Sequence, residues 1–229
     1  MNAWRFLAWG PLACALLSTG CVGPNLVTKS AKFPLMYEEK PLTILVLPPI
    51  NSTTAADAKG YYATTISPPL ALSGYYVLPI EVTDDILKSQ GLYDTEMIGD
   101  QPLDRFGQYF GADAVLFTHI KKWDKSYMVL AATLTVSVDA RLKSTKTNRV
   151  LWEYSGIIVA DLSGNSSGGG GLGGLIAQVV VTAVNSAAAD YVPYARLANA
   201  QLLRSIPVGR YNARAGQDGE DKILAQALR

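Results

Sequence analysis

The chain has 229 residues, of which 49% are hydrophobic and 17% are charged. This length suits one domain with a sizeable core, and the composition excludes disorder along the whole chain. The 20 lysines and arginines nearly balance the 19 aspartates and glutamates, giving a net charge of +1, so no charge excess points to nucleic acid. Two cysteines and one histidine are too few for a disulfide scaffold or a Cys/His zinc site.

Residues 1–20 predict a cleaved signal peptide, because one arginine precedes an uncharged apolar run over residues 6–17 and small residues follow it. That run is shorter than the roughly 20 residues of a membrane-spanning helix. The sequence LLSTGC at residues 16–21 resembles the bacterial lipobox, in which the cysteine is lipidated and becomes the first residue. Cys21 is therefore the candidate lipid attachment site; the alternative is an ordinary signal peptide followed by a free thiol.

A lipid on Cys21 implies membrane anchoring, since each buried methylene contributes about 0.8 kcal/mol. Val22, rather than an aspartate, follows the cysteine, which by analogy with bacterial lipoproteins favours the outer membrane. Residues 21–41 are predicted to be a lipidated terminus and an extended tether, because this segment contains three prolines and no periodicity. At about 3.3–3.6 Å per residue, the tether would reach roughly 60 Å.

A compact domain is predicted over residues 42–206, and its first half alternates strands and helices. Residues 43–47 form a continuous apolar run, typical of a central strand covered on both faces. A helix is predicted over residues 55–67, ended or kinked by Pro68 and Pro69. The remaining elements are a strand over residues 75–79, a helix capped by Thr83 that runs to Gln90, and a helix over residues 103–110 that Gly111 ends.

Beyond Gly111 the hydrophobic period changes to two. Apolar residues occupy every second position from Met128 to Leu142, and polar residues lie between them. The predicted strands cover residues 114–122, 128–142 and 150–159, with turns at residues 124–125 and 144–148. A strand–helix–strand unit, a three-stranded antiparallel meander and C-terminal helices together predict a single compact α+β domain.

The last part of the chain opens on a Gly/Ser-rich loop over residues 163–174. The apolar stretch 175–189 follows, and its small residues favour a buried helix that packs on the sheet or on a second copy; the alternative is insertion into a bilayer. An amphipathic helix is predicted over residues 191–204, with Pro193 in its first turn. Residues 207–229 are predicted to be a loose polar tail with a short helix at 223–228.

No arrangement of residues predicts a catalytic centre, a cofactor site or a metal site. Gly169, Gly171 and Gly174 match G-x-G-x-x-G, but no strand follows the predicted helix, so the segment is interpreted as a flexible loop. His119 lacks partners at triad or metal spacing and is interpreted as structural. The remaining candidates are Asp57, Asp84 and Asp85, interpreted as caps or solvated side chains, and the pairs Tyr61–Tyr62 and Tyr75–Tyr76, interpreted as core and rim packing.

Several motifs together resemble one family. They are LPPINS at residues 47–52, PLALSGYYVLP at 69–79, GLYDTE at 91–96, FGADAVL at 110–116, IKKW at 120–123, LWE at 151–153 and DYVP at 190–193. The chain resembles, over residues 42–205, a family of bacterial outer-membrane lipoproteins without an assigned function, typified by a neisserial genome-derived vaccine antigen. The resemblance implies a periplasm-facing lipoprotein, a homodimer, and distant kinship with the curli-secretion lipoprotein and the TolB N-terminal domain. It supplies no catalytic residues.

These observations favour a non-enzymatic, lipid-anchored periplasmic binding or assembly module of the outer membrane, an accessory of an envelope secretion or export complex. Its interface is expected on the polar face or the edge of the meander. Expected partners are the outer membrane, a second copy of the chain, and envelope proteins like those of curli secretion. Nucleic acid and a small-molecule substrate are not expected. The alternatives are a lipoprotein regulator that reaches a cell-wall-building enzyme on its long tether, and an envelope hydrolase that uses His119.

Overall fold

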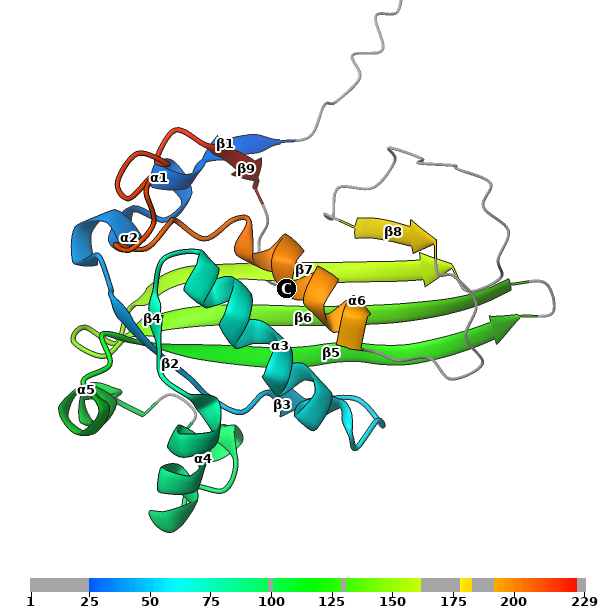
Figure 1. Ribbon diagram of the computed structural model, residues 1–229, viewed down its shortest axis with the longest axis horizontal. Coiled ribbons are helices and arrows are strands. Elements are labelled where there is room, and N and C mark those ends of the chain that lie inside the picture. The colour runs from blue at the N-terminus through cyan, green and yellow to red at the C-terminus, as the bar shows by residue number, and fades with distance from the viewer. Residues whose placement is uncertain (1–24, 99–100, 129–130, 162–177, 183–191, 226–229) are drawn as a thin grey trace, which may run out of the picture.

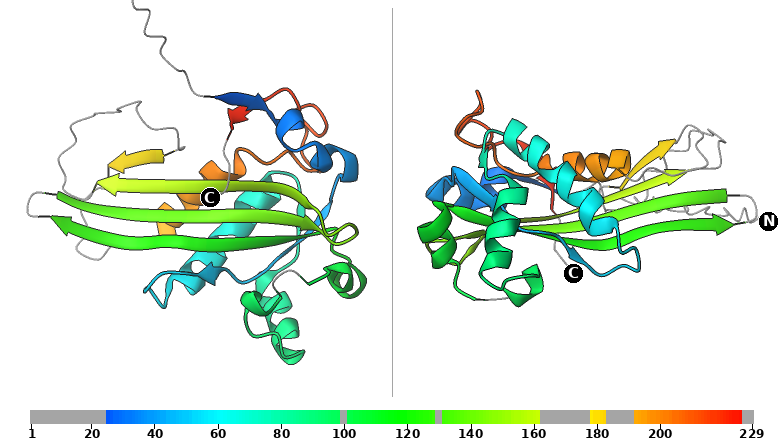
Figure 2. Two further views of the ribbon diagram at one scale, coloured as in Figure 1. Left: turned by 180° about the vertical axis from the view of Figure 1, so that it is seen from behind. Right: turned by 60° about the horizontal axis from the view of Figure 1, so that its bottom comes forward.

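The computed structural model describes residues 25–98, 101–128, 131–161, 178–182 and 192–225. A mixed sheet with the strand order β4-β2-β5-β6-β7-β8 forms its centre, with β3 pairing separately on β5. Helices α3 and α6 lie on one face of this sheet (Figures 1 and 2). The architecture confirms the α+β class. The predicted signal peptide, Cys21 and the Gly/Ser-rich loop lie outside the described residues.

The first half of the domain is the predicted strand–helix–strand unit. Strand β2 (Thr43–Val46) pairs in parallel with β4 (Tyr76–Val77) and β5, while the short β3 (Ile50–Asn51) pairs with β5 further along. Strand β2 is covered on both faces as predicted, because Ile44 and Val46 enter one hydrophobic cluster whereas Leu45 and Leu47 enter another.

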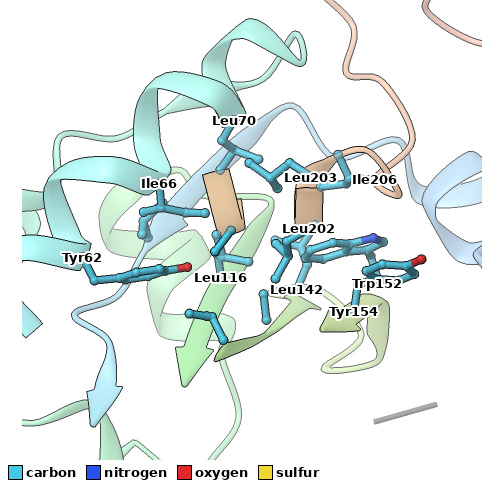
Figure 3. Packing of buried hydrophobic residues seen from close by; sticks show 14 of the residues in the cluster. Tyr62, Ile66, Leu70, Leu116, Leu142, Trp152, Tyr154, Leu202, Leu203 and Ile206 are labelled. Atoms are coloured by element: carbon cyan, nitrogen blue, oxygen red, sulfur yellow. The ribbon is translucent and has the colours of Figure 1, made fainter. Parts of the chain in front are cut away.

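Helix α3 (Ala58–Leu72) continues through Pro68 and Pro69, so the predicted stop at these prolines is wrong. Tyr62, Ile66 and Leu70 are fully buried at four-residue spacing on the face toward the sheet. Each such side chain contributes about 1.5–3 kcal/mol on burial, which favours one further turn despite the two missing N–H donors. Figure 3 shows these residues against Leu116, Leu142 and Trp152 of the sheet.

The second cluster joins α4 (Ile80–Ser89) and α5 (Asp104–Phe110) to β2 and the start of β5, and it includes Ile98, which follows the 3-10 helix η1 (Thr95–Met97). Helix α4 begins three residues before the predicted cap, so Thr83 is not its N-cap; the Thr83 hydroxyl instead donates to the Pro79 and Ile80 carbonyls. Gly111 ends α5 in the left-handed conformation, as predicted.

The meander consists of β5 (Ala114–Met128), β6 (Ala131–Ser144) and β7 (Val150–Asp161). All neighbouring pairs are antiparallel, and a register shift between Ile120 and Lys122 marks a β-bulge. The predicted turn at residues 124–125 is wrong because β5 pairs with β6 as far as Met128. The turn between β6 and β7 falls at residues 145–149, close to the prediction.

Beyond the meander, residues 178–182 form strand β8 (Gln178–Thr182), which pairs in parallel with β7. The predicted helix over 175–189 is therefore wrong at these residues, and the rest of that stretch lies outside the described residues. The run of three valines in β8 is β-branched and favours a strand. Helix α6 (Val192–Leu203) agrees with the predicted helix over 191–204.

The two chain segments predicted to be loose are folded together. Strand β1 (Leu26–Thr28) pairs with β9 (Lys222–Leu224), and helices α1 (Lys29–Lys32) and α2 (Pro34–Glu39) follow β1 (Figure 1). Phe33 and Met36 are buried in the main core, and this burial explains why the segment is not an extended tether. The predictions of a tether over 26–41, a loose tail over 207–225 and a helix at 223–228 are thus wrong for the described residues.

We call this unit, residues 26–41 together with residues 204–225, the clasp. At its centre the buried Lys29 ammonium lies 3.2 Å from Asp218 Oδ2 and donates to the Ile206 carbonyl at 2.9 Å. The Asp218 carboxylate is fully buried and also accepts from the Val208 N–H at 2.8 Å and the Tyr37 hydroxyl at 3.2 Å. Burial first, and then the Asp218 carboxylate, raise the pKa of Tyr37. A buried charge pair of this kind is stable only because its remaining hydrogen bonds are satisfied.

Candidate functional site: the open face of the meander

The meander has one buried face and one open face. Its buried face carries apolar side chains from all three strands, including Leu116, Val138 and Trp152, beneath α3 and α6. The opposite face is covered at one end by the second cluster, which includes Val115. Beyond that end, none of the described helices covers it (Figure 2). The alternation predicted from sequence therefore places polar side chains on a surface that is open among the described elements.

One polar row crosses this face. Ser52, just after β3, lies with its Oγ 2.6 Å from Nε2 of His119 on β5. His119 is the register partner of Asp139 on β6, and Asp139 in turn pairs with Ser155 on β7. Ser155 Oγ donates to Asp139 Oδ1 at 2.6 Å, and Lys121 Nζ lies 3.9 Å from Asp139 Oδ2. Four chain segments thus meet in one row.

A second row lies beside the first. Arg141 on β6 donates through Nε to Glu153 Oε2 on β7 at 3.2 Å, and both side chains are substantially exposed. Nearer the second cluster, Lys143 Nζ lies 6.0 Å from the ring centroid of Phe117. The open face therefore presents both signs of charge on a rigid three-stranded support, which is a surface suited to a complementary protein partner.

The electrostatics of His119 favour its neutral form. Partial burial, and then the positive charge of Lys121, lower its pKa, while Asp139 and Glu96 oppose the shift. A neutral imidazole can accept or donate at Nε2, so the Ser52 contact suits either tautomer. The Asp139 carboxylate accepts a hydrogen bond from Ser155 and lies near the Lys121 ammonium. Among the described residues, it accepts no hydrogen bond from His119. The third member of a Ser-His-Asp relay is therefore missing from this arrangement.

The edge of the sheet beside this face is partly unpaired. On β5, residues 114–116 pair with β2 and residues 119–120 pair with β3. From Lys121 to Met128, no described strand pairs with the same edge. Lys122 and Asp124 are exposed there, and charges on an edge strand prevent indiscriminate strand addition.

The other candidate residues from the sequence do not come together in one site. In each tyrosine pair one ring is buried, Tyr62 and Tyr75, and the other is about half exposed, Tyr61 and Tyr76, as predicted. Burial raises the pKa of both buried phenols. Asp84 is ion-paired with Lys88 at 2.6 Å on the surface, and Asp57 occupies the N-cap position of α3 without a side-chain hydrogen bond. The glycines 169, 171 and 174 lie outside the described residues.

Two polar groups that the sequence did not single out prove important. Asp113 joins β2 to β5, because its Oδ2 accepts from the N–H groups of Leu42 and Thr43 at 3.0 and 3.1 Å. Burial alone would raise the pKa of Asp113, but these hydrogen bonds and Lys146 lower it overall. The other is Asp218 of the clasp. An aspartate just before a strand is only a weak indication of the role of Asp113. No local pattern in the sequence indicates the role of Asp218.

Among the described residues, no group of three potential metal ligands is found, and none of the helices has the length and apolar character required to cross a bilayer.

The fold is a single α+β domain whose sheet is covered by helices on one face and is partly open on the other. Residues 33–210 match the model of the family described as "Putative lipoprotein GNA1162-like". The chain belongs to this family. It is 34% identical over 178 residues to "Putative lipoprotein NMB1124/NMB1162" of Neisseria meningitidis serogroup B (strain ATCC BAA-335 / MC58), covering 77% of this chain and 82% of that protein.

One solved structure agrees with this assignment. The crystal structure of lipoprotein GNA1162 from Neisseria meningitidis is 31% identical, with a TM-score of 0.52, over 56% of this chain and 89% of that one. A weaker likeness, with a TM-score of 0.45 and 16% identity over 72% of this chain and 89% of the other, is to a PelC dodecamer from Paraburkholderia phytofirmans. The family match, the neisserial relative and the GNA1162 structure confirm the resemblance found in the sequence motifs.

Proposed function

We propose that this lipoprotein-family chain is acylated at Cys21, faces the periplasm from the outer membrane, and acts there as a non-enzymatic binding or assembly module of an envelope secretion or export complex. The observation that carries the binding role is the open face of the meander, where Arg141, Glu153 and the Ser52–Ser155 row stand on a rigid sheet. The incomplete relay at His119 supports a role without catalysis. A second copy of the chain is among the expected partners.

The regulator hypothesis depended on a long tether that would reach a cell-wall-building enzyme. Residues 26–41 belong to the folded clasp instead. The chain therefore lacks, over these residues, the extended tether on which this alternative was based. The binding module is the hypothesis that the geometry supports better.

Two measurements test the proposal. The first compares radioactive palmitate labelling and outer-membrane fractionation of the native chain and Cys21→Ala; label and fractionation that survive the substitution contradict the anchor. The second replaces Lys122, which is exposed on β5 beside the open face, with a photo-crosslinking amino acid in the acylated chain in cells. As the control, the same amino acid is placed at Arg196, which is exposed on α6 on the other side of the sheet.

We expect a stoichiometric crosslink, to an envelope protein or to a second copy, from position 122 and not from position 196. The variant Arg141→Glu should lose the complex, and Arg141→Glu combined with Glu153→Arg should recover part of it, because the cross-strand pair is rebuilt with reversed sense. Equal crosslinking from both positions, or none from either, contradicts a binding role for this face. Loss of function in Ser52→Ala and His119→Ala with the complex intact would favour the hydrolase instead.

A further inference from the structure

The clasp fixes how far the folded domain can lie from the lipid. The first described residue, Asn25, accepts a hydrogen bond from the Ala225 N–H at 2.9 Å, and the β1–β9 pairing begins at the next residue, where Leu26 is the partner of Leu224. Cys21 is only four residues before Asn25. Even a fully extended chain spans at most about 14 Å over that distance.

The chain beyond Asn25 cannot be released without breaking the clasp. Strand β1 is held by the β1–β9 pairing, the Lys29 N–H donates to the Asp221 carbonyl, and the Ser30 N–H donates to the Gly219 carbonyl, both at 3.0 Å. The buried Lys29–Asp218 pair and the buried Phe33 follow within five residues of β1. Releasing further residues from the clasp would therefore expose a buried ion pair and core side chains.

We infer that the clasp seats the domain directly on the bilayer, with the surface around the β1–β9 pair against the phospholipid headgroups of the leaflet that carries acylated Cys21. This inference rests on the proposed acylation. Leu26 is half exposed on that surface, and an apolar side chain beside several acyl chains can enter the interfacial zone. The partner of this surface is a phospholipid membrane.

The clasp contacts the meander on the face that carries the buried side chains, because Phe33, Met36 and Tyr154 belong to the same core cluster. Strands β5 to β7 belong to the same sheet that the clasp contacts through α2 and β7, where the Tyr154 hydroxyl donates to the Leu224 carbonyl at 3.3 Å.

The test uses the acylated full-length product in vesicles of phosphatidylethanolamine and phosphatidylglycerol that contain a rhodamine-labelled lipid as energy acceptor. A donor dye is attached to Lys222→Cys on β9 or, as the matched control, to Asp85→Cys on α4. Both positions are exposed, and in Figure 1 β9 lies near the top of the view and α4 at the bottom. The chain has two cysteines, Cys14 in the predicted signal peptide and Cys21, so an acylated product carries no competing thiol.

We expect stronger energy transfer from position 222 than from position 85. A flexible Gly/Ser segment inserted between Gly23 and Pro24 should remove the difference, because the domain then moves freely above the bilayer. Equal transfer at the two positions in the native-length protein, unchanged by the insertion, overturns the inference. Failure of the acylation itself is distinguishable, since mass spectrometry would then find an unmodified Cys21 and the protein would not bind the vesicles.

Discussion

The clasp and the open face of the meander both depend on charged side chains, but they use them in opposite ways. In the clasp, the Lys29–Asp218 pair is almost wholly removed from solvent and joins residues 189 positions apart. On the open face, Arg141 and Glu153 are exposed and only 12 positions apart. The buried pair therefore holds the ends of the chain together, whereas the exposed pair contributes little to stability and is available to a partner.

The largest effect is expected from breaking the clasp. Asp218→Ala would leave the Lys29 ammonium buried without its carboxylate and would remove the acceptor of the Val208 N–H and the Tyr37 hydroxyl. We expect a loss of about 3–5 kcal/mol in the free energy of unfolding, measured by urea denaturation. The exposed Arg214–Asp221 pair of the same unit is the control, and Arg214→Ala should leave the urea midpoint close to that of the native protein. Equal losses of stability in the two variants would show that burial does not make the Lys29–Asp218 pair more important than the exposed pair.

A second, smaller loss of stability is expected from disturbing the contact between the meander and α6. A Cβ added at Gly156 of β7 would lie 2.8 Å from the Ala198 carbonyl oxygen and 3.2 Å from Leu202 Cβ on α6. Gly156→Ala should therefore destabilise the protein by about 1–3 kcal/mol, as overpacking does. Gly60→Ala on α3 is the matched control, because nothing lies within 4 Å of the added Cβ, and it should stabilise by about 0.5–1 kcal/mol. Thermal unfolding of both variants distinguishes the two outcomes.

The same contrast explains what the sequence could reveal. The meander was predictable because apolar and polar residues alternate within each strand and the strands follow one another along the chain. The clasp was not, because its strands have three residues each and its contacts join positions 26–41 with 204–225. The polar residues of the open face were visible as an alternating set, but the Ser52–His119 contact depends on where β3 pairs with β5, which no local pattern specifies.

A third prediction concerns the junction between β2 and β5. Asp113→Ala removes an ionised acceptor from two backbone N–H groups, and we expect a loss of about 1–3 kcal/mol at pH 7. Because the pKa of Asp113 is lowered in the folded state, its contribution is complete above the ordinary aspartate pKa and is lost as the pH falls through the depressed value. Urea denaturation at pH 7 and in acid should show the difference between native and variant protein shrinking in acid. A difference independent of pH contradicts the role of the ionised carboxylate.

The smallest effect belongs to the open face, and it is a change in pH dependence more than in stability. The pKa of His119 is lowered in the folded protein, so the folded state binds a proton less readily than the unfolded chain does. Stability should therefore decline as the pH falls through about 6.5, the unfolded value, and level off below the folded value. His119→Gln keeps a polar group facing Ser52 without titrating, and should lack this decline in urea denaturation between pH 7.5 and pH 5. An identical slope in both proteins would mean that the imidazole is as easily protonated in the fold as in the unfolded chain, and the open face would then carry a positive charge at His119 in mildly acidic medium.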